Sequence, residues 1–356
     1  MIMSMMRQPL NSVKRARTER GWTQEELARR AGISRAAVSA IEIERLVPSV
    51  AAAMALARSF DCSVEEIFGQ SSAASPDQLQ WAWTPSIHPC RFWQATVGGR
   101  RWFYPVETTA SGVVEHDGIV THETVHYRVR PETEKTLVLG CCDPAAALLA
   151  SEIRQRTGFR VIVLPRSSQE ALSLLGQGLI HAAGIHLATN RAPRGNERAV
   201  RQHFQAECQL MRVAHWQEGL AVSETAGVRS VGSALRSQLR WIGRYEGSAA
   251  RQCQDELLRH RPAPKRKARD HRSVADAIRN GWADAGICLR LVSEEAGLRF
   301  LPVRQEIFEW CIPSGGSEHQ LLQALRNTIQ SSSYRKLLKD LPGYDPRECG
   351  ETQWVN

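Results

Sequence analysis

Apolar and small residues near the N-terminus recur three and four positions apart, in the segment WTQEELARRAGISRAAVSAIE. This spacing is typical of amphipathic helices, and it is interrupted at Gly32, whose left-handed backbone turns the chain sharply. Thr23 and Ser34 stand where N-caps belong, and Val38 and Ile41 share the inward face of the second helix. The pattern predicts two short helices joined by a tight turn.

The outward face of the second helix consists of small residues. A rotation of about 100° per residue puts Ala36, Ser39 and Ala40 on that face. Small side chains let a helix backbone enter the major groove of DNA, and Arg35 is placed to reach a guanine edge. Gln24 and the free amides at the start of the first helix would hold a phosphate. DNA binding is therefore predicted, with an ordinary helical hairpin as the alternative.

From Thr136 the pattern changes to apolar runs such as TLVLGCC and FRVIVLP, separated by longer amphipathic segments. This alternation predicts a parallel sheet with right-handed crossovers. A second set of the same kind begins at MRVAHWQEGLAVSE, and a closing helix is expected from about residue 318 to 339. Two α/β lobes imply a cleft between them, where ligands bind.

The segments between these patterns divide the chain. Residues 70–77, QSSAASPD, are small and polar and predict a linker. Residues 78–134 are rich in aromatic and β-branched side chains, with a glycine pair at 98–99 as a hairpin turn. We therefore predict a multi-domain chain: an all-α head over 10–69, a linker, a small β-rich connecting region, and an α/β two-lobed domain over 135–345.

Composition and charge say less about function than the hydrophobic pattern does. The 356 residues carry 46 basic and 37 acidic side chains, a net charge of +9 that suits a polyanionic partner without identifying one. The chain has no long apolar run, and MIMSMMRQ lacks the apolar stretch of a secretory signal, so we expect a cytoplasmic protein without a membrane partner. A basic segment over 259–272 is interpreted as an exposed loop, with nonspecific phosphate contact as the alternative.

Cysteine usage argues against a disulfide framework. Nine cysteines, an odd number, occur without a CxxC pair, so neither disulfides nor a structural zinc site is indicated. We predict no metal and no cofactor. Cys141 and Cys142 are adjacent, which leaves a redox or soft-metal sensor as a minor alternative.

Residues 10–69 resemble the phage repressor and Cro (XRE) family over the whole stretch from VKRARTERGW to CSVEEIF. The resemblance implies a five-helix, lambda-repressor-like head that binds double-stranded DNA. After Glu42 the family usually has a polar residue and then glycine, whereas this chain has Ile43 and Glu44, so Arg45 is the expected phosphate contact there. The predicted DNA-binding residues are Thr23, Gln24, Ser34, Arg35, Ala36, Ala37, Ser39, Ala40 and Arg45.

The α/β part looks like the type II periplasmic-binding-protein fold. It most resembles the substrate-binding-like domain related to molybdate-binding proteins, in GCCDP, AGIHL, RYEGSAAR and WADAGICL. In RYEGSAAR the second glycine of the family's turn is Ala249, which reduces close backbone approach to a ligand. The resemblance implies a small-molecule ligand, with an oxyanion such as molybdate as a candidate.

The chemistry of such a cleft follows from helix ends. Strand-to-helix turns present unpaired amides at the positive ends of helices, which suits an oxyanion or a carboxylate. Arg244 and Arg251 would add charge-assisted bonds, and His186 would close the far side. Asp143 as an N-cap argues against an anion, and plain helix capping remains the alternative for the serines. The predicted ligand-binding residues are Cys142, Asp143, Ser167, Ser168, His186, Arg244, Gly247, Ser248 and Arg251.

Three hypotheses of function follow. The leading one is a ligand-responsive transcription regulator, acting as a homodimer whose paired heads read half-sites about 34 Å apart. The second is an enzyme of cofactor metabolism. It is disfavoured because the chain has no nucleophile elbow, phosphate-binding loop or dinucleotide fingerprint, and no histidine with an evident acid partner. The third is a regulator whose α/β domain has lost its ligand and serves as a dimerisation platform.

Overall fold

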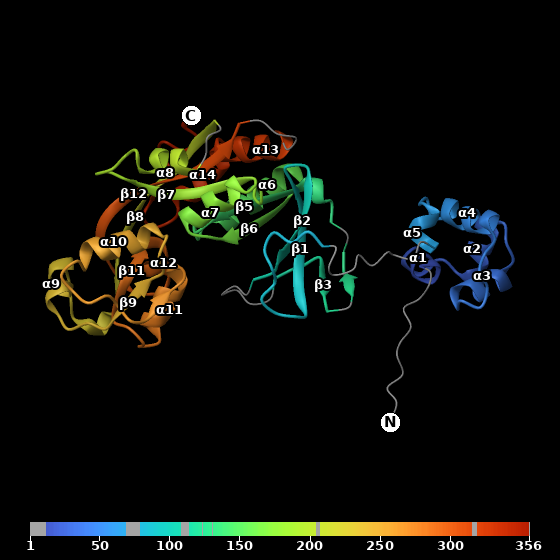
Figure 1. The fold of residues 1–356 in the computed structure, drawn as a ribbon, viewed down its shortest axis with the longest axis horizontal. Helices are drawn as coiled ribbons and strands as arrows, with labels where there is room; N and C mark the ends of the chain where they lie inside the picture. The colour runs from blue at the N-terminus through green and yellow to red at the C-terminus, as the bar shows by residue number, and fades with distance from the viewer. Residues whose placement is uncertain are drawn as a thin grey trace, which may run out of the picture. The chain divides into compact units, whose positions relative to one another are not determined.

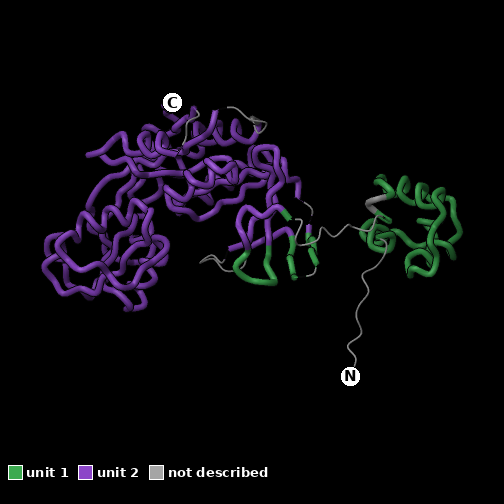
Figure 2. The backbone as a smooth tube through the Cα atoms, viewed as in Figure 1, with its two compact units in different colours: residues 1–79, 85–91, 118–128 green, residues 80–84, 92–117, 129–356 purple. Residues whose placement is uncertain are grey.

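The computed structural model describes residues 12–68, 79–107, 114–122, 124–129, 131–203, 207–314 and 319–355 (Figure 1). The chain divides into two compact units, coloured in Figure 2. Unit 1 comprises residues 1–79, 85–91 and 118–128, and unit 2 comprises residues 80–84, 92–117 and 129–356. The predicted linker at 70–77 lies outside the described residues.

The N-terminal part of unit 1 is helical. Its helices are α1 (Val13–Glu19), α2 (Gln24–Ala31), α3 (Arg35–Glu42), α4 (Val50–Ser59) and α5 (Val64–Phe68). As the sequence predicts, Thr23 Oγ1 caps α2 by accepting from Glu26 N at 3.1 Å, and Ser34 Oγ caps α3 by accepting from Ala37 N. Gly32 ends α2 at φ 65°, in the left-handed region. One buried cluster holds the helices together, formed by Val13, Leu27, Ala28, Ala31, Val38, Ile41, Leu56, Phe60 and Ile67.

Two short antiparallel pairs follow. β1 (Cys90–Val97) pairs with β2 (Arg100–Pro105) across Gly98 and Gly99, both at positive φ, and β3 (Gly118–Val120) pairs with β4 (Val125–Tyr127). Within unit 2 the first pair packs on the α/β part, because the Tyr104 hydroxyl donates to the carbonyl of Leu179 at 2.8 Å. The predicted glycine hairpin is thus confirmed, and its strands share a core with the two-lobed domain.

The two-lobed domain is built on one mixed sheet. Its first lobe contains β5 (Thr136–Cys141), α6 (Ala146–Thr157), β6 (Arg160–Pro165), α7 (Ser168–Gly176), β7 (Ala182–Thr189), α8 (Gly195–His203), α13 (His319–Ile329) and α14 (Ser332–Lys339). Its second lobe contains α9 (Val231–Arg236), β9 (Trp241–Arg244), α10 (Ala249–Leu257), β10 (Lys267–Ala268), α11 (His271–Arg279), β11 (Ala285–Leu289) and α12 (Arg290–Glu295). Both lobes share the long strands β8 (Cys208–Val222) and β12 (Arg299–Pro313), and β13 (Tyr344–Asp345) and β14 (Thr352–Val355) pair with β8.

Pairing within the described sheet runs β10-β9-β11-β8-β12-β7-β5-β6. The strands β5, β6 and β7 are parallel to one another, as are β9, β10 and β11, so the parallel expectation holds inside each lobe. It is wrong for β8 and β12, which pair antiparallel with each other over nearly their whole length. The sheet is therefore mixed rather than parallel.

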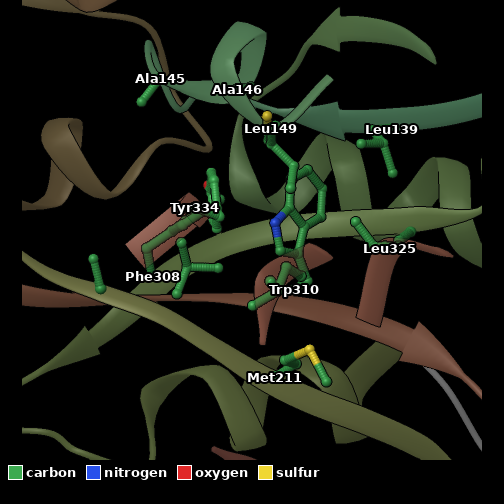
Figure 3. Close-up of a cluster of buried hydrophobic side chains, with 14 of the residues drawn as sticks. Leu139, Ala145, Ala146, Leu149, Met211, Phe308, Trp310, Leu325 and Tyr334 are labelled. Atoms are coloured by element: carbon green, nitrogen blue, oxygen red, sulfur yellow. The ribbon is translucent and has the colours of Figure 1, made fainter. Parts of the chain in front are cut away.

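Each lobe has its own apolar core. In the first lobe, Leu139, Leu149, Met211, Trp310 and Leu325 converge between the sheet and the helices that cover it (Figure 3). The second lobe buries a separate cluster that includes β9, α11 and β11 side chains. Burial of apolar surface contributes about 25 cal/mol per Å². Each lobe can therefore hold its shape while the shared strands connect them.

Two further expectations are corrected. The predicted closing helix is two helices, because the helical conformation is interrupted between Ile329 and Ser332. The basic segment over 259–272 is more than a loop, since it contributes the strand β10 and the first residues of α11. No helix within the described ranges combines the length and the apolar composition that a membrane span requires.

Candidate functional site

The outward face of α3 is open to solvent and made of small side chains. Arg35 and Ala36 are exposed, while Ala37, Ser39 and Ala40 are half-buried. Val38 and Ile41 point into the core, as the spacing predicts. The guanidinium of Arg35 is held only by a loose contact, 3.8 Å from Glu25, with both side chains largely exposed. This face has the size and charge needed to approach a base-pair edge.

A buried carboxylate ties α1, α2 and α3 together, and the sequence analysis did not identify it. Glu42 accepts from Arg17 Nε at 2.6 Å and Nη2 at 3.1 Å, and from Gln24 Nε2 at 2.9 Å. The side chain of Glu42 is 2% exposed. The amide of Gln24 is therefore engaged inside the head, although it was predicted as a phosphate contact.

The loop after α3 carries unusual backbone geometry. Glu44 adopts φ 61°, in the left-handed region, at the position where the XRE pattern has glycine. Arg45, the predicted substitute contact, follows directly and is exposed. The departure from the family pattern therefore keeps the backbone conformation that a glycine would adopt.

In unit 2, the starts of two helices from different lobes lie close together. Ser167 caps α7 in a capping box with Glu170, and Ser248 caps α10. A β-carbon added to Gly247, at φ 84°, would lie 3.4 Å from Gln169 Oε1 and 3.5 Å from Ser167 Oγ. Ser167 and Ser248 are helix caps, as the alternative interpretation predicts for these two serines, and their helices bring two positive ends together.

Arg244 is the most unusual charge near these helix starts. It is 1% exposed, its Nη1 donates to His271 Nδ1 at 3.0 Å, and its Nη2 donates to the carbonyl of Arg269 at 3.4 Å. Its Nε has no hydrogen-bond partner, and none of the ion pairs among the described residues includes Arg244. Burial, followed by the charge of Arg244, holds the pKa of His271 well below its ordinary value. His271 is therefore neutral, and the guanidinium charge of Arg244 is not balanced by a negative charge from this contact.

The other predicted ligand residues are engaged within the protein. Asp143 is not the N-cap of α6, which is Ala145; instead Asp143 is buried and accepts from the Tyr344 hydroxyl at 2.6 Å. Arg251 donates to Asp255 on its own helix. Ser168 is fully buried and accepts from the backbone amide of His186 at 3.2 Å.

The predicted residues Cys142 and His186 meet, and they meet a residue that the sequence analysis missed. Cys142 Sγ lies 2.9 Å from His186 Nε2, and His186 Nδ1 lies 2.7 Å from Glu306 Oε2. Burial lowers the pKa of His186, but the charges of Cys142 and Glu306 outweigh it and raise that pKa well above its ordinary value. The expectation that no histidine has an acid partner is therefore wrong.

Glu306 anchors a wider buried network. It also accepts from Trp216 Nε1 at 2.9 Å and from Arg304 Nε at 2.9 Å. Arg304 in turn donates to Glu218 and to the carbonyl of Ala249, the first residue of α10. Burial raises the pKa of Glu306, but the charge and hydrogen bond of His186 and the charge of Arg304 lower it overall. Burial, with the charge of Glu306, raises the pKa of Glu218 to about 8.

Two open hollows on the surface lie elsewhere. One, of about 270 Å³, is lined by Gln209, Pro313, Ser314, Leu322, Gln323, Arg326 and Trp354. The other, of about 320 Å³, is lined by Leu239, Trp241, Leu258, Arg261, Pro262, Pro264 and Lys265. None of the predicted ligand residues lines either hollow.

The chain combines an N-terminal helix-turn-helix in unit 1 with a domain in unit 2 whose two lobes share the long strands β8 and β12. Residues 150–330 match the PBP superfamily domain, and residues 13–67 match the helix-turn-helix family. The chain belongs to the PBP superfamily and carries an XRE-type helix-turn-helix.

Three known proteins are similar to parts of this chain. The uncharacterized protein YvgK of Bacillus subtilis (strain 168) is 26% identical over 197 residues, which are 52% of this chain and 63% of YvgK. PhnD1 from Prochlorococcus marinus (MIT 9301), solved with methylphosphonate, is 14% identical with a TM-score of 0.42, covering 60% of this chain and 93% of PhnD1. The tungstate ABC transporter structure from Geobacter sulfurreducens is 12% identical with a TM-score of 0.44, covering 58% and 99%.

Proposed function

We propose that this protein is a sequence-specific transcription regulator, in which the head binds DNA and the two-lobed domain binds a small anion. The role is regulatory rather than enzymatic, and the protein acts on DNA in the cytoplasm as a homodimer. Paired heads would read half-sites about 34 Å apart. A ligand can change DNA binding only if its affinity differs between the two states of the protein.

DNA binding is supported by the exposed, small-residue face of α3. Arg35 is exposed at the first turn of that helix, and Arg45 is exposed just beyond its end. Ser34 and Thr23 place the amides at the starts of α3 and α2 where a phosphate can meet the positive helix ends. Base contact from Arg35 would supply specificity, while Arg45 and the helix starts would set position.

Replacement of Arg35 tests the DNA contact. In Arg35→Ala, a lost guanine contact should cost about 1–3 kcal/mol on the specific site and relax preference at one base position. The assay is fluorescence anisotropy with a site selected from genomic DNA and a scrambled duplex. Arg29→Ala is the matched control, because Arg29 is an exposed α2 arginine paired with Glu26. If Arg35→Ala lowers the affinity for both duplexes equally, Arg35 contacts phosphate rather than a base.

The single observation that carries the anion site is the buried guanidinium of Arg244. A buried charge without a partner is costly, so such groups are paired or bind an ion. Arg244 ends β9, and the α10 that follows starts next to the start of α7. An oxyanion or a carboxylate would accept bidentate hydrogen bonds from the guanidinium and further bonds from the helix amides. We name Ser167, Gly247 and Arg244 as the residues nearest the anion.

Thermal shift tests this site. Molybdate, tungstate, phosphate and small carboxylates are added to the full chain, and an anion at 100 times its Kd should stabilise the fold by about 2.7 kcal/mol. Arg244→Gln should abolish the shift, while Arg240→Gln keeps it, because Arg240 is an exposed arginine of the same lobe paired with Asp284. Circular dichroism shows whether each variant is folded.

The outcome also separates the alternatives. A shift with cationic or neutral metabolites only, or an undiminished anion shift in folded Arg244→Gln, would refute the anion site. The absence of any shift across a broad panel would support the dimerisation platform. Neither result would affect the DNA-binding test with Arg35→Ala.

A further inference from the structure

One cluster in unit 2 is not explained by anion binding. Cys142, His186 and Glu306 stand in line, with Sγ to Nε2 at 2.9 Å and Nδ1 to Oε2 at 2.7 Å. This is the order of nucleophile, base and orienting acid that activates thiols in proteins. Cys142 directly follows β5, His186 lies in β7 and Glu306 lies in β12. His186 and Glu306 are buried, whereas Cys142 is partly exposed.

The geometry of the network provides a proton acceptor for Cys142. Arg304 balances the carboxylate of Glu306, and Glu218, with its pKa raised to about 8, is mainly protonated at neutral pH. The sulfur of Cys142 faces Nε2 of His186, and Glu306 holds Nδ1, so Nε2 is placed to take the thiol proton. Asp143, the other acid beside Cys142, has its pKa raised by burial despite the hydrogen bond from Tyr344. Once His186 has taken the proton, the carboxylate of Glu306 stabilises the imidazolium that faces the sulfur.

Access distinguishes Cys142 from the other thiols. Of the nine cysteines, Cys62 and Cys142 are partly exposed and the others are buried. Cys141, the neighbour of Cys142, is 2% exposed, and burial raises its pKa well above the ordinary value. A reactive thiol must be reachable and must face a group that can take its proton, and Cys142 meets both requirements.

We propose that Cys142 is a covalent modification site, at which the thiolate held by His186 and Glu306 attacks a small hydroperoxide. The sulfur forms a bond to one peroxide oxygen, and the O–O bond breaks. The leaving hydroxide or alkoxide takes the proton from His186 Nε2, so water or an alcohol departs. The sulfur is oxidised to a sulfenic acid, the peroxide is reduced, and His186 is left neutral.

Acyl transfer, the other reaction of such a cluster, is disfavoured by the backbone. It needs free amides near the nucleophile to stabilise an oxyanion. The amides of the N-cap Ala145 and of Ala146, the first residue of α6, are engaged instead: Ala145 N donates to the side chain of Asp143, and Ala146 N donates to the carbonyl of Asp143. In the attack on a hydroperoxide, the negative charge develops on the leaving hydroxide or alkoxide, which His186 can protonate. This reaction needs no oxyanion-binding amides, so the hydroperoxide is the favoured electrophile.

The network reaches both sides of the proposed anion site. The amide of His186 donates to Ser168 at the start of α7, and Glu306 connects through Arg304 to the carbonyl of Ala249 at the start of α10. Oxidation of Cys142 adds an oxygen atom beside His186 and changes its hydrogen bond, so anion affinity should change several-fold. This consequence rests on the proposed function, whereas the reactivity of Cys142 does not.

Mass spectrometry of the full chain tests the reactivity, with Cys62 as an internal reference. At pH 6 an ordinary thiol is almost wholly protonated, so Cys142 should react with iodoacetamide at least about tenfold faster than Cys62. With hydrogen peroxide and dimedone, the adduct should form first on Cys142. His186→Gln should bring the rate at Cys142 down to that of Cys62, and Cys141→Ala should leave it unchanged.

The alkylation and oxidation experiments test different parts of the proposal. A wild-type Cys142 that reacts no faster than Cys62 with iodoacetamide refutes the thiolate, whatever happens to the variants. Fast alkylation with slow oxidation refutes the hydroperoxide as the electrophile. If His186→Gln is poorly folded by circular dichroism, the wild-type ratio still decides. Because no DNA or anion is present, failure here is distinct from failure of the proposed function.

Discussion

The buried carboxylate of Glu42 should decide whether the head stays folded. In Glu42→Ala, the variant loses three hydrogen bonds from Arg17 and Gln24, at 2.6, 3.1 and 2.9 Å, and leaves the charge of Arg17 without its partner. Removing one member of a buried pair costs about 3–5 kcal/mol. Because the side chain of Arg17 is 14% exposed and still donates to the carbonyl of Trp22, the lower end applies.

This loss is large for so small a domain. A helical head over residues 13–67 has a total stability of roughly 3–8 kcal/mol. A loss of about 3 kcal/mol should lower hydrogen-exchange protection in α1, α2 and α3 by about a hundredfold, since each 1.4 kcal/mol is a factor of ten. Hydrogen exchange with mass spectrometry on the full chain measures this, with unit 2 as the internal control.

Glu25→Ala is the matched control for Glu42→Ala. Glu25 is 79% exposed and lies 3.8 Å from Arg35, so its loss should cost under about 1 kcal/mol. Burial raises the pKa of Glu42, but the bonds from Arg17 and Gln24 lower it overall, so its contribution is present above the unfolded pKa and is lost as pH falls. Protection that drops less than fivefold in Glu42→Ala, or equally in both variants, would refute the reasoning.

Two other substitutions test the buried network and the α3 loop. Glu218 keeps its proton up to about pH 8, whereas an unfolded glutamate loses it near pH 4.3, so its contribution to stability is lost as pH rises through this window. The Tm of the wild type should therefore fall between pH 5.5 and 8, and Glu218→Gln should make this fall smaller. The exposed control Glu256→Gln should show the same fall as the wild type. An unchanged fall in Glu218→Gln would contradict the raised pKa of Glu218. Glu44→Gly should stabilise the head by about 0.5–1 kcal/mol, because a left-handed residue other than glycine is strained, and hydrogen exchange that stays equal or becomes faster would contradict this.

Local signals explain why the head could be read from the sequence. Thr23, Gly32 and Ser34 act on backbone groups within three or four residues, so their spacing alone fixes where α2 ends and α3 begins. The inward positions of Val38 and Ile41 follow from helical periodicity. The contact of Arg17 with Glu42 spans 25 residues and depends on how the helices cross, which no local pattern specifies.

The two-lobed domain could be read only in part, for the same reason. Alternating strands and helices predicted both lobes, but the antiparallel pairing of β8 with β12 joins segments that are far apart in the sequence. His186 and Glu306 are 120 positions apart, and their contact depends on the register between β7 and β12. The sequence pointed to Cys142 and His186 separately, without the acid that aligns them.

The strands shared by the lobes have a mechanical consequence. Pairing along β12 is irregular between Pro302 and Arg304 and again between Phe308 and Glu309, so Arg304 and Glu306 occupy the stretch flanked by two bulges. Bulges bend and twist a strand locally, which makes them natural pivots. If one lobe swings against the other, atoms near the pivot travel least. The ionised groups would keep their partners through such a swing, while the helix tips farther out would open and close.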